Sequence, residues 1–221
     1  MLLSRLIPRR ATRAATLAAL GAALALLAGC RLMALPFLMW GEEPTKTVAA
    51  EYADLGGKKI AVAVWAEMDT RFEYPFVQLE IAEHVRAALE ASLKGTTFVP
   101  ARQIVEHQKR NPEWERGSPG ALAARFKADR VLLVELSQYS TREPDSPHLL
   151  RGRISAAVKV YGADEQRDAP LYRTTVDTVF PEDSVGQFGV SDDQVRRATM
   201  EAFASDVARK FHEHKIKVKK S

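Results

Sequence analysis

ALAARFKADRVLLVEL, residues 121–136, predicts a helix that runs directly into a buried strand. The helix is expected over residues 119–127 and the strand over residues 130–138, where short apolar side chains predominate. A second run of this kind, IAVAVWA, covers residues 60–66. Strands that are apolar on both faces lie inside covered sheets. The two runs therefore predict a sheet with helices packed on it.

Further helices are predicted by apolar residues at helical spacing. The clearest stripe follows Pro75 and ends before Gly95: Val77, Ile81, Val85, Leu89 and Leu93. A shorter helix is expected over residues 100–109. Ser191, followed by two aspartates, is a good helix start, and the apolar stripe after it continues to Phe211.

The remaining strands are predicted over residues 96–99, 151–161 and 171–180. The last two are joined by a short charged turn, so they are expected to be antiparallel. Loops are expected after Ala66, around residues 111–118 and over residues 142–147. The element order is β-α-β-α-(α)-β-β-β-α, and the predicted fold class is α/β (α+β) with a mixed sheet of about five strands.

Over residues 58–212 the chain resembles a small α/β domain of bacterial envelope proteins. This domain occurs in the amino-terminal part of TolB, in the lipoprotein activator of penicillin-binding proteins and in the curli secretion-channel (CsgG-like) subunit. The resemblance is carried by KKIAVAVWA, by the helix after it, and by the passage from helix to strand through Ala128-Asp129. Those families usually have a glycine where this chain has Lys127. The resemblance implies an accessory or assembly protein that binds envelope partners, without a catalytic signature.

The amino terminus predicts export and lipidation. Residues 1–13 contain four arginines and no acid, and residues 14–28 form an uncharged apolar run, as in a signal peptide. Leu27, Ala28, Gly29 and Cys30 resemble the bacterial lipobox, in which the cysteine receives a diacylglyceryl group. Membrane lipid is then a partner through acylated Cys30, since two acyl chains hold a protein stably on a bilayer. The alternative is an uncleaved anchor over residues 14–40, interrupted by Arg31 and Pro36.

The expected organisation has four parts. Residues 1–29 are the signal peptide, and residues 30–57 hold the lipidated cysteine, an apolar segment and a linker with room for a short helix. Residues 58–213 form the α/β domain, and residues 214–221 form a basic tail. The apolar segment LMALPFLMW, residues 32–40, either contacts the membrane interface or packs on the domain. Because Arg31 is not an aspartate, we expect an outer-membrane lipoprotein that faces the periplasm.

Charge and cysteine content exclude several classes of protein. The formal charge is +4, and the four arginines of the signal peptide account for all of it. No nucleic-acid partner is therefore expected. A single cysteine excludes an internal disulfide, a zinc ribbon and a CxxC redox site.

No catalytic constellation is found, so we expect no enzyme, no cofactor and no metal site. HExxH, GxSxG, P-loop and GxGxxG motifs are absent. His212 and His214 lie two apart near a helix end, which favours a solvated pair over a chelating one. His84 and His107 fall on charged helical faces, and His148 is expected in a loop.

Glu135 and Asp177 are strand carboxylates with two interpretations. A buried pair would suit a hydrolase or a ligand-binding protein. A cross-strand ion pair with Arg153 or Arg173 is the commoner use of such residues.

Trp114 is the one candidate for a partner contact. It lies in NPEWERGSP, between two prolines, where an aromatic ring either anchors an interface or caps the sheet edge. The leading hypothesis is a membrane-anchored envelope lipoprotein that binds a protein partner. A structural tether, and association between copies of the chain as a homo-oligomer, stay open. The lysines of the tail either solubilise the chain or contact an acidic surface.

Overall fold

The computed structural model describes residues 45–143, 146–163, 169–182 and 189–217, without the side chain of Pro147. Contacts divide the chain into two compact units, residues 47–214 and residues 1–46 with 215–221. Strands β1 (Thr45–Val48) and β7 (His214–Lys217) form a two-stranded sheet. Every other described element belongs to the first unit, which is called the domain below.

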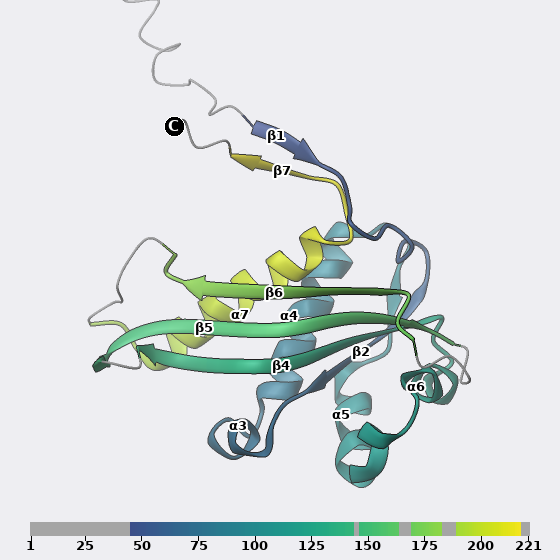
Figure 1. Cartoon of the computed structure of the whole chain (residues 1–221), viewed down its shortest axis with the longest axis horizontal. Coiled ribbons are helices and arrows are strands. Elements are labelled where there is room, and N and C mark those ends of the chain that lie inside the picture. The colour runs from purple at the N-terminus through teal and green to yellow at the C-terminus, as the bar shows by residue number, and fades with distance from the viewer. Residues whose placement is uncertain (1–44, 144–145, 164–168, 183–188, 218–221) are drawn as a thin grey trace, which may run out of the picture. The chain divides into compact units, whose positions relative to one another are not determined.

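The domain contains a mixed five-stranded sheet, as the sequence predicts (Figure 1). In spatial order its strands are β3 (Thr97–Phe98), β2 (Lys59–Trp65), β4 (Arg130–Glu143), β5 (Ser146–Gly162) and β6 (Tyr172–Phe180). β2 is parallel to both β3 and β4, whereas β5 is antiparallel to both of its neighbours, β4 and β6. The antiparallel pairing of the last two strands is thus confirmed.

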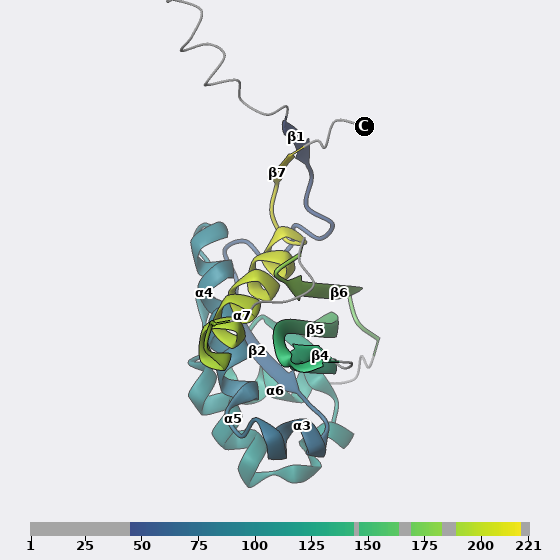
Figure 2. The ribbon, with the colours of Figure 1, turned by 90° about the vertical axis from the view of Figure 1, so that its left-hand side faces the viewer.

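Five helices and one 3-10 helix are found among the described residues. They are α3 (Met68–Glu73), α4 (Val77–Ser92), α5 (Ala101–Arg110), the 3-10 helix η1 (Pro112–Arg116), α6 (Pro119–Phe126) and α7 (Asp192–Arg209). Helices α4 and α7 lie together on one side of the sheet, and α5 and α6 lie by β2 and β4 (Figures 1 and 2). The predicted helices and strands are all found in the predicted order, and α3 and η1 are additional.

Alternation along the central strands produces two apolar cores. Ile60, Val62 and Val64 of β2 point into the larger core, which α4 and α7 cover. Ala61 and Ala63 point into the smaller core, which includes residues of α5 and α6. On β5 one face is apolar and buried: Ile154, Ala156, Val158 and Val160. The intervening side chains belong to the opposite face.

Two helix ends show how local sequence sets the bounds of α7 and α6. Ser191 forms a capping box with Gln194 at the start of α7, as predicted. Lys127 ends α6 in the left-handed region, with φ 49° and ψ 46°. Asp129 then accepts a hydrogen bond from Lys59 N at 2.8 Å, which ties the helix end to the first residue of β2. The glycine expected at position 127 from the family resemblance is thus replaced by a lysine in the conformation that glycine favours.

Gly152 marks a close approach of β5 to α7. A Cβ atom added at Gly152 would lie 2.6 Å from Cβ of Thr199 and would also overlap the Thr199 hydroxyl. Thr199 is itself fixed, because its hydroxyl donates to the carbonyl of Val195 at 2.6 Å. Only a residue without a side chain fits at this crossing.

Residues before β2 are part of the domain, although the sequence suggests a linker there. Leu55 is fully buried in the larger core. The backbone N–H groups of Glu51 and Tyr52 donate to Lys210 O at 2.8 and 3.1 Å. The Tyr52 ring stacks on Tyr172 with centroids 5.4 Å apart.

The Glu51 carboxylate links the segment before β2 to the end of α7 and to β6. It accepts hydrogen bonds from Lys210 Nζ at 2.7 Å and from the Tyr172 hydroxyl at 2.6 Å. The Lys210 ammonium, and then the Tyr172 hydroxyl, lower the pKa of Glu51 below 4.5. Burial, with the Glu51 carboxylate beside it, raises the pKa of Tyr172 to about 12.

Several predicted loops are wrong. The loop after Ala66 contains α3, and the loop around residues 111–118 contains η1. The loop expected over residues 142–147 is largely strand, because β4 runs to Glu143 and β5 starts at Ser146. Polar residues predominate in this hairpin, and Arg153 Nη2 joins the Glu143 carboxylate at 2.8 Å across it. Thr141 and Leu150 are buried, but no described side chain between them is, so the segment gives no alternating pattern that would reveal the strands.

Candidate functional site

Two tryptophans line a pocket on the surface of the domain. Trp65 is the last residue of β2 and Trp114 lies in η1, and both are partly exposed while they pack on the smaller core. The pocket has a volume of about 330 Å³. Its lining is Trp65, Trp114, Glu115, Gly117, Pro119, Leu133 and Glu135. We call this site the tryptophan pocket.

The sheet places one wall of the tryptophan pocket. Trp65 of β2 and Glu135 of β4 are register partners on adjacent parallel strands. Register partners point to the same face, so the indole and the carboxylate stand side by side. Leu133 is two residues before Glu135 and therefore shares this face. The pocket thus begins where the paired part of β2 ends.

The segment between α5 and α6 places the opposite wall. Pro112 opens η1, and the N–H of Trp114 donates to Asn111 O at 2.9 Å. The N–H of Gly117 donates to Trp114 O at 3.2 Å, which closes the turn. Pro119 then starts α6. Fixed proline torsions on both sides restrict the backbone that presents the indole. The structure therefore brings together two residues that the sequence singles out separately, Trp114 and Glu135.

The charges of the pocket are mostly acidic. Glu115 is exposed at the rim, and Glu135 is only 32% exposed. Glu135 Oε2 forms an ion pair with Lys159 Nζ at 2.6 Å. The predicted cross-strand pairing is thus found, but with Lys159 instead of Arg153 or Arg173. Among the residues that the structure describes, no basic side chain lines the pocket.

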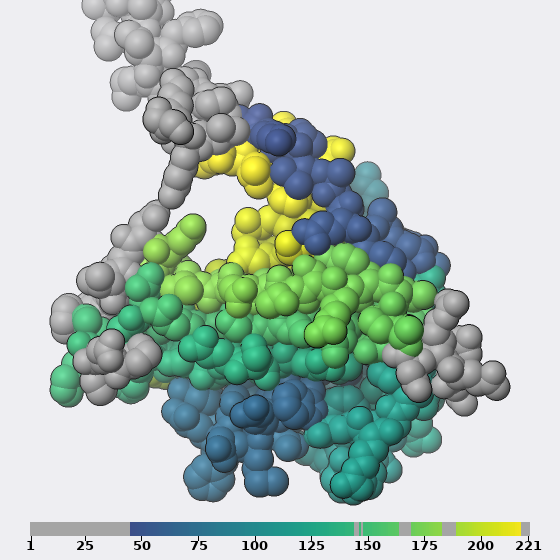
Figure 3. Space-filling model, in the orientation of Figure 1, coloured from purple at the N-terminus to yellow at the C-terminus, as the bar shows by residue number. Residues whose placement is uncertain are grey.

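The face of the sheet that carries Glu135 continues across β5 and β6, where part of it is uncovered. On this side, α6 packs only on the Tyr161 end of β5. No described helix covers the rest of this side of β5 and β6 in the two ribbon views, and Figure 3 shows the side chains of these strands as an exposed band. Its middle carries short side chains in register, Ala157 beside Thr175 and Ser155 beside Asp177. A flat strip of the sheet therefore lies next to the wall that holds Glu135, the register partner of Ala157.

The carboxylates of Glu135 and Asp177 do not form a buried pair. Asp177 is exposed on the edge strand β6. Asp177 lies two strands away from Glu135 and two residues along β6 from Thr175, which is level with Glu135. This separates the Cα atoms of Glu135 and Asp177 by about 12 Å. Glu135 is instead ion-paired with Lys159. The predicted buried pair of carboxylates is therefore not present.

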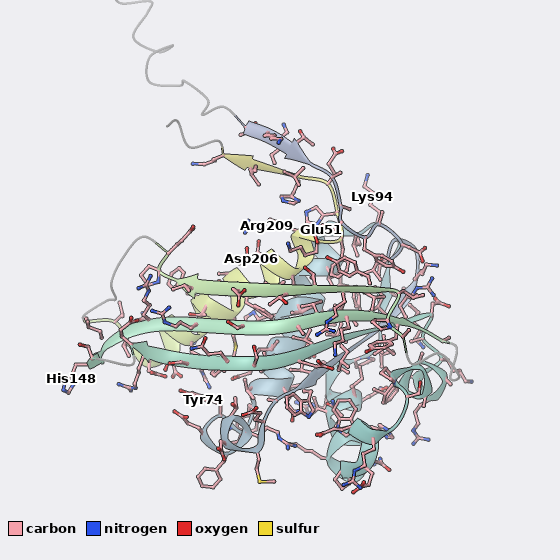
Figure 4. All side chains as sticks on the ribbon, viewed as in Figure 1. Glu51, Tyr74, Lys94, His148, Asp206 and Arg209 are labelled. Carbon is pink, nitrogen blue, oxygen red and sulfur yellow. The ribbon has the colours of Figure 1, made fainter. Side chains whose placement is uncertain are left out.

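A second, larger pocket of about 690 Å³ lies between β6 and α7. Its polar side chains are engaged with one another. The Thr178 hydroxyl donates to Asp206 at 2.6 Å, and Arg209 is ion-paired with Asp206 at 2.7 Å. Figure 4 shows Asp206 and Arg209 together on α7.

The histidines do not assemble into a site in the described part of the chain. His212 and His214 bond through Nδ1 to backbone carbonyls, at 2.8 and 3.2 Å. Burial lowers the pKa of His107, whose ring contacts Phe126. His148 lies in β5 instead of a loop, at the tip of the hairpin (Figure 4). The described residues hold no group of three side chains suited to a metal ion.

Sequence reasoning missed an exposed apolar group on and after α3. Met68 and Phe72, one helical turn apart, are 75% and 89% exposed, and Phe76 is 62% exposed. The four-residue spacing of Met68 and Phe72 is visible in the sequence, but no long apolar stripe accompanies it to predict a helix. Exposed apolar residues are ordinary on protein surfaces, and none of these three lines the tryptophan pocket.

The predicted anchor lies outside the described residues. This applies to Leu27, Ala28, Gly29 and Cys30, to the apolar segment 32–40 and to the last four residues of the tail. Within the part that is described, no helix has both the length and the apolar character needed to cross a membrane.

Comparison with known proteins gives similarity to solved structures alone. No family model matches the chain, and no curated protein matches it. It is similar to the PelC dodecamer from Paraburkholderia phytofirmans, with 12% identity, coverage of 76% of this chain and 98% of that one, and a TM-score of 0.44. It is also similar to lipoprotein GNA1162 from Neisseria meningitidis, with 16% identity, coverage of 55% of this chain and 81% of that one, and a TM-score of 0.39. A minor lipoprotein from Acinetobacter baumannii is similar with 13% identity, coverage of 70% of this chain and 90% of that one, and a TM-score of 0.34.

These likenesses are distant. Several of the similar structures are lipoproteins, but every TM-score given above is below 0.5. The resemblance to the TolB, penicillin-binding-protein activator and curli-channel domains is not confirmed by a family model. The functional proposals for this chain therefore rest on its own residues.

Proposed function

We propose that this chain is a non-enzymatic lipoprotein of the bacterial envelope, whose domain binds another envelope protein at the tryptophan pocket. The observation that carries the proposal is the presentation of Trp114. Tryptophan is among the residues that most often dominate binding energy at interfaces, particularly beside a pocket. Here a partly exposed indole is held by a restricted backbone over a pocket of about 330 Å³.

The anchor part of the proposal rests on the sequence before the domain. A basic start, an apolar run and the tetrad ending at Cys30 occur together, and Cys30 is the only cysteine. Since Arg31 follows the cysteine, we place the protein at the outer membrane, facing the periplasm. The anchor would hold the domain within reach of other envelope proteins, which raises their effective concentration.

The anchor is tested by the intact mass of the membrane-extracted protein, with wild type compared with Cys30→Ala. A mass that fits residues 30–221 plus a diacylglyceryl group, absent from the variant, supports lipidation. If both proteins keep residues 1–29 without lipid, the apolar stretch is an uncleaved anchor and the lipoprotein assignment fails.

Protein binding is tested by affinity capture from chemically crosslinked envelopes. Wild type is compared with Trp114→Ala and with Phe72→Ala, the control, because Phe72 is an exposed aromatic residue of α3 away from the pocket lining. Losing an interface tryptophan typically weakens binding by about thirtyfold or more. Wild type and Phe72→Ala should therefore capture the same protein, and Trp114→Ala should lose it. Recovery of lipid without any protein, or equal capture by all three, would contradict the proposal. Thermal melting of Trp114→Ala shows whether the domain stays folded.

A further inference from the structure

The lining of the tryptophan pocket has the chemistry of a site for an organic cation. It combines two indole rings with two carboxylates, and no described basic side chain lines it. The face of an indole ring is electron-rich and attracts a cation within about 6 Å. A carboxylate is the usual hydrogen-bond acceptor for a guanidinium or ammonium group. The two kinds of group favour the same ligand.

The arrangement of these groups is fixed by the fold. Register pairing sets Glu135 beside Trp65, and η1 sets Glu115 beside Trp114. Each wall therefore supplies one ring and one carboxylate. Lys159 engages Oε2 of Glu135 at 2.6 Å. An ionised carboxylate accepts about four hydrogen bonds, so this one contact leaves acceptor capacity on Glu135. The lining carboxylates and Lys159 together keep a net negative charge.

The size of the site limits the ligand. A volume of about 330 Å³ is at the lower end of the range for small-molecule sites. It suits one long side chain better than a nucleotide or a sugar chain. The apolar part of the lining, Leu133 and Pro119, matches the methylene stem that arginine and lysine carry behind the charge.

We propose that the tryptophan pocket receives an arginine or lysine side chain of the protein partner. This inference rests on the proposed function, because it names the group through which that partner binds. The aromatic faces hold the cation from the side, and Glu115 and Glu135 neutralise it. Arginine is the better fit, since its planar guanidinium both stacks on indole and bonds a carboxylate through two N–H groups.

The test uses the lipidated chain, residues 30–221, in detergent with ¹⁵N-labelled tryptophan. The indole N–H signals of Trp65 and Trp114 are assigned with single Trp→Phe variants. Nα-acetyl-arginine amide is then compared with Nα-acetyl-citrulline amide, which has nearly the same shape without the charge. We expect the arginine probe to shift both signals saturably and to bind at least about tenfold more tightly than the citrulline probe.

Variants separate the pocket from the rest of the surface. Glu115→Gln should weaken binding of the arginine probe about threefold to tenfold, because it removes one carboxylate. Glu113→Gln is the matched control, since Glu113 lies on the same 3-10 helix, pairs with Arg116 and is not part of the lining. Trp114→Leu, which keeps an apolar side chain but removes the ring, should weaken binding of the arginine probe and reduce the difference between the two probes. Melting curves confirm that each variant is folded.

The outcomes distinguish this inference from the proposed function. Equal binding of both probes, no shift with either, or full binding by Trp114→Leu would overturn the cation site. If a protein is captured through Trp114 while the arginine probe leaves the indoles unmoved, protein binding stands and the cation site fails. If the arginine probe binds but no protein is captured at the pocket, the partner side chain is the wrong occupant and both proposals fail in their stated form.

Discussion

Trp65 and Glu135 are direct neighbours on the parallel strands β2 and β4, with their side chains on the same face of the sheet. Their position is that of many ligand sites in α/β proteins, which lie beyond the carboxyl ends of parallel strands. Trp65 is the last residue of β2, so the sheet leaves room there for a third group. Trp114 from η1 supplies it. The tryptophan pocket is therefore a consequence of strand register and of one proline-bounded turn.

Gly152→Ala should destabilise the domain by about 1–3 kcal/mol, the usual cost of overpacking. The added methyl carbon would collide with Thr199 on α7, because it would lie 2.6 Å from the Thr199 Cβ atom. Urea denaturation followed by circular dichroism measures the change. Gly56→Ala is the control, since nothing lies within 4 Å of a Cβ atom there. Equal stability of Gly152→Ala and wild type would show that β5 and α7 do not approach each other this closely.

Lys127→Gly should stabilise the domain by about 1 kcal/mol, because residues other than glycine are strained in the left-handed region. Lys127 ends α6 there, with a φ of 49°. Lys127→Ala keeps a Cβ atom and should not show the gain. Differential scanning calorimetry compares the melting temperatures of the three proteins. A melting temperature for Lys127→Gly at or below that of wild type would contradict the left-handed helix end.

Glu51→Gln should lower stability at neutral pH by up to about 1 kcal/mol, since the ion pair with Lys210 is partly exposed. The pKa of Glu51 is lowered in the folded state by Lys210 and Tyr172. Its contribution is therefore complete above the ordinary value of 4.5 and is lost as pH falls through the lowered pKa. The difference between variant and wild type, followed by denaturation at several pH values, should shrink in acid. A difference independent of pH would show that the Glu51 charge contributes nothing.

A control for this prediction is Glu106→Gln. Glu106 forms an exposed pair with Arg110 on α5, with a separation of 3.8 Å. Its loss should change stability by less than about 0.5 kcal/mol.

Much of the fold could be predicted because the buried helices and strands have recognisable stripes or runs of apolar residues. The stripe from Val77 to Leu89 has a clear helical period, the runs around Val62 and Val134 are continuously apolar, and each is buried as expected. Prediction failed where buried residues are few, as in the β4–β5 hairpin, or where none is buried, as in α3. It also missed Leu55, because one buried side chain in a polar segment has no periodicity.

The candidate site could be predicted only in its parts. Restricted backbone around Trp114 and an acidic residue within a buried strand can each be recognised in the sequence. That Trp114 and Glu135 line the same pocket cannot be predicted, because it depends on the register of β2 with β4 and on where η1 packs. Lys159 was missed as the partner of Glu135 for the same reason, since the ion pair joins the adjacent strands β4 and β5 two residues away from Ala157, the register partner of Glu135.

The central claim is that the tryptophan pocket binds an envelope protein, and site-specific photo-crosslinking in intact cells tests it most directly. A photoreactive amino acid is placed at Glu115, which leaves Trp65, Trp114 and Glu135 intact, or at Glu113 on the same 3-10 helix as the control. We predict one discrete protein adduct from position 115 that is absent from position 113 and disappears when Trp114→Ala is added. No protein adduct from position 115, or the same adduct from both positions, would contradict the account.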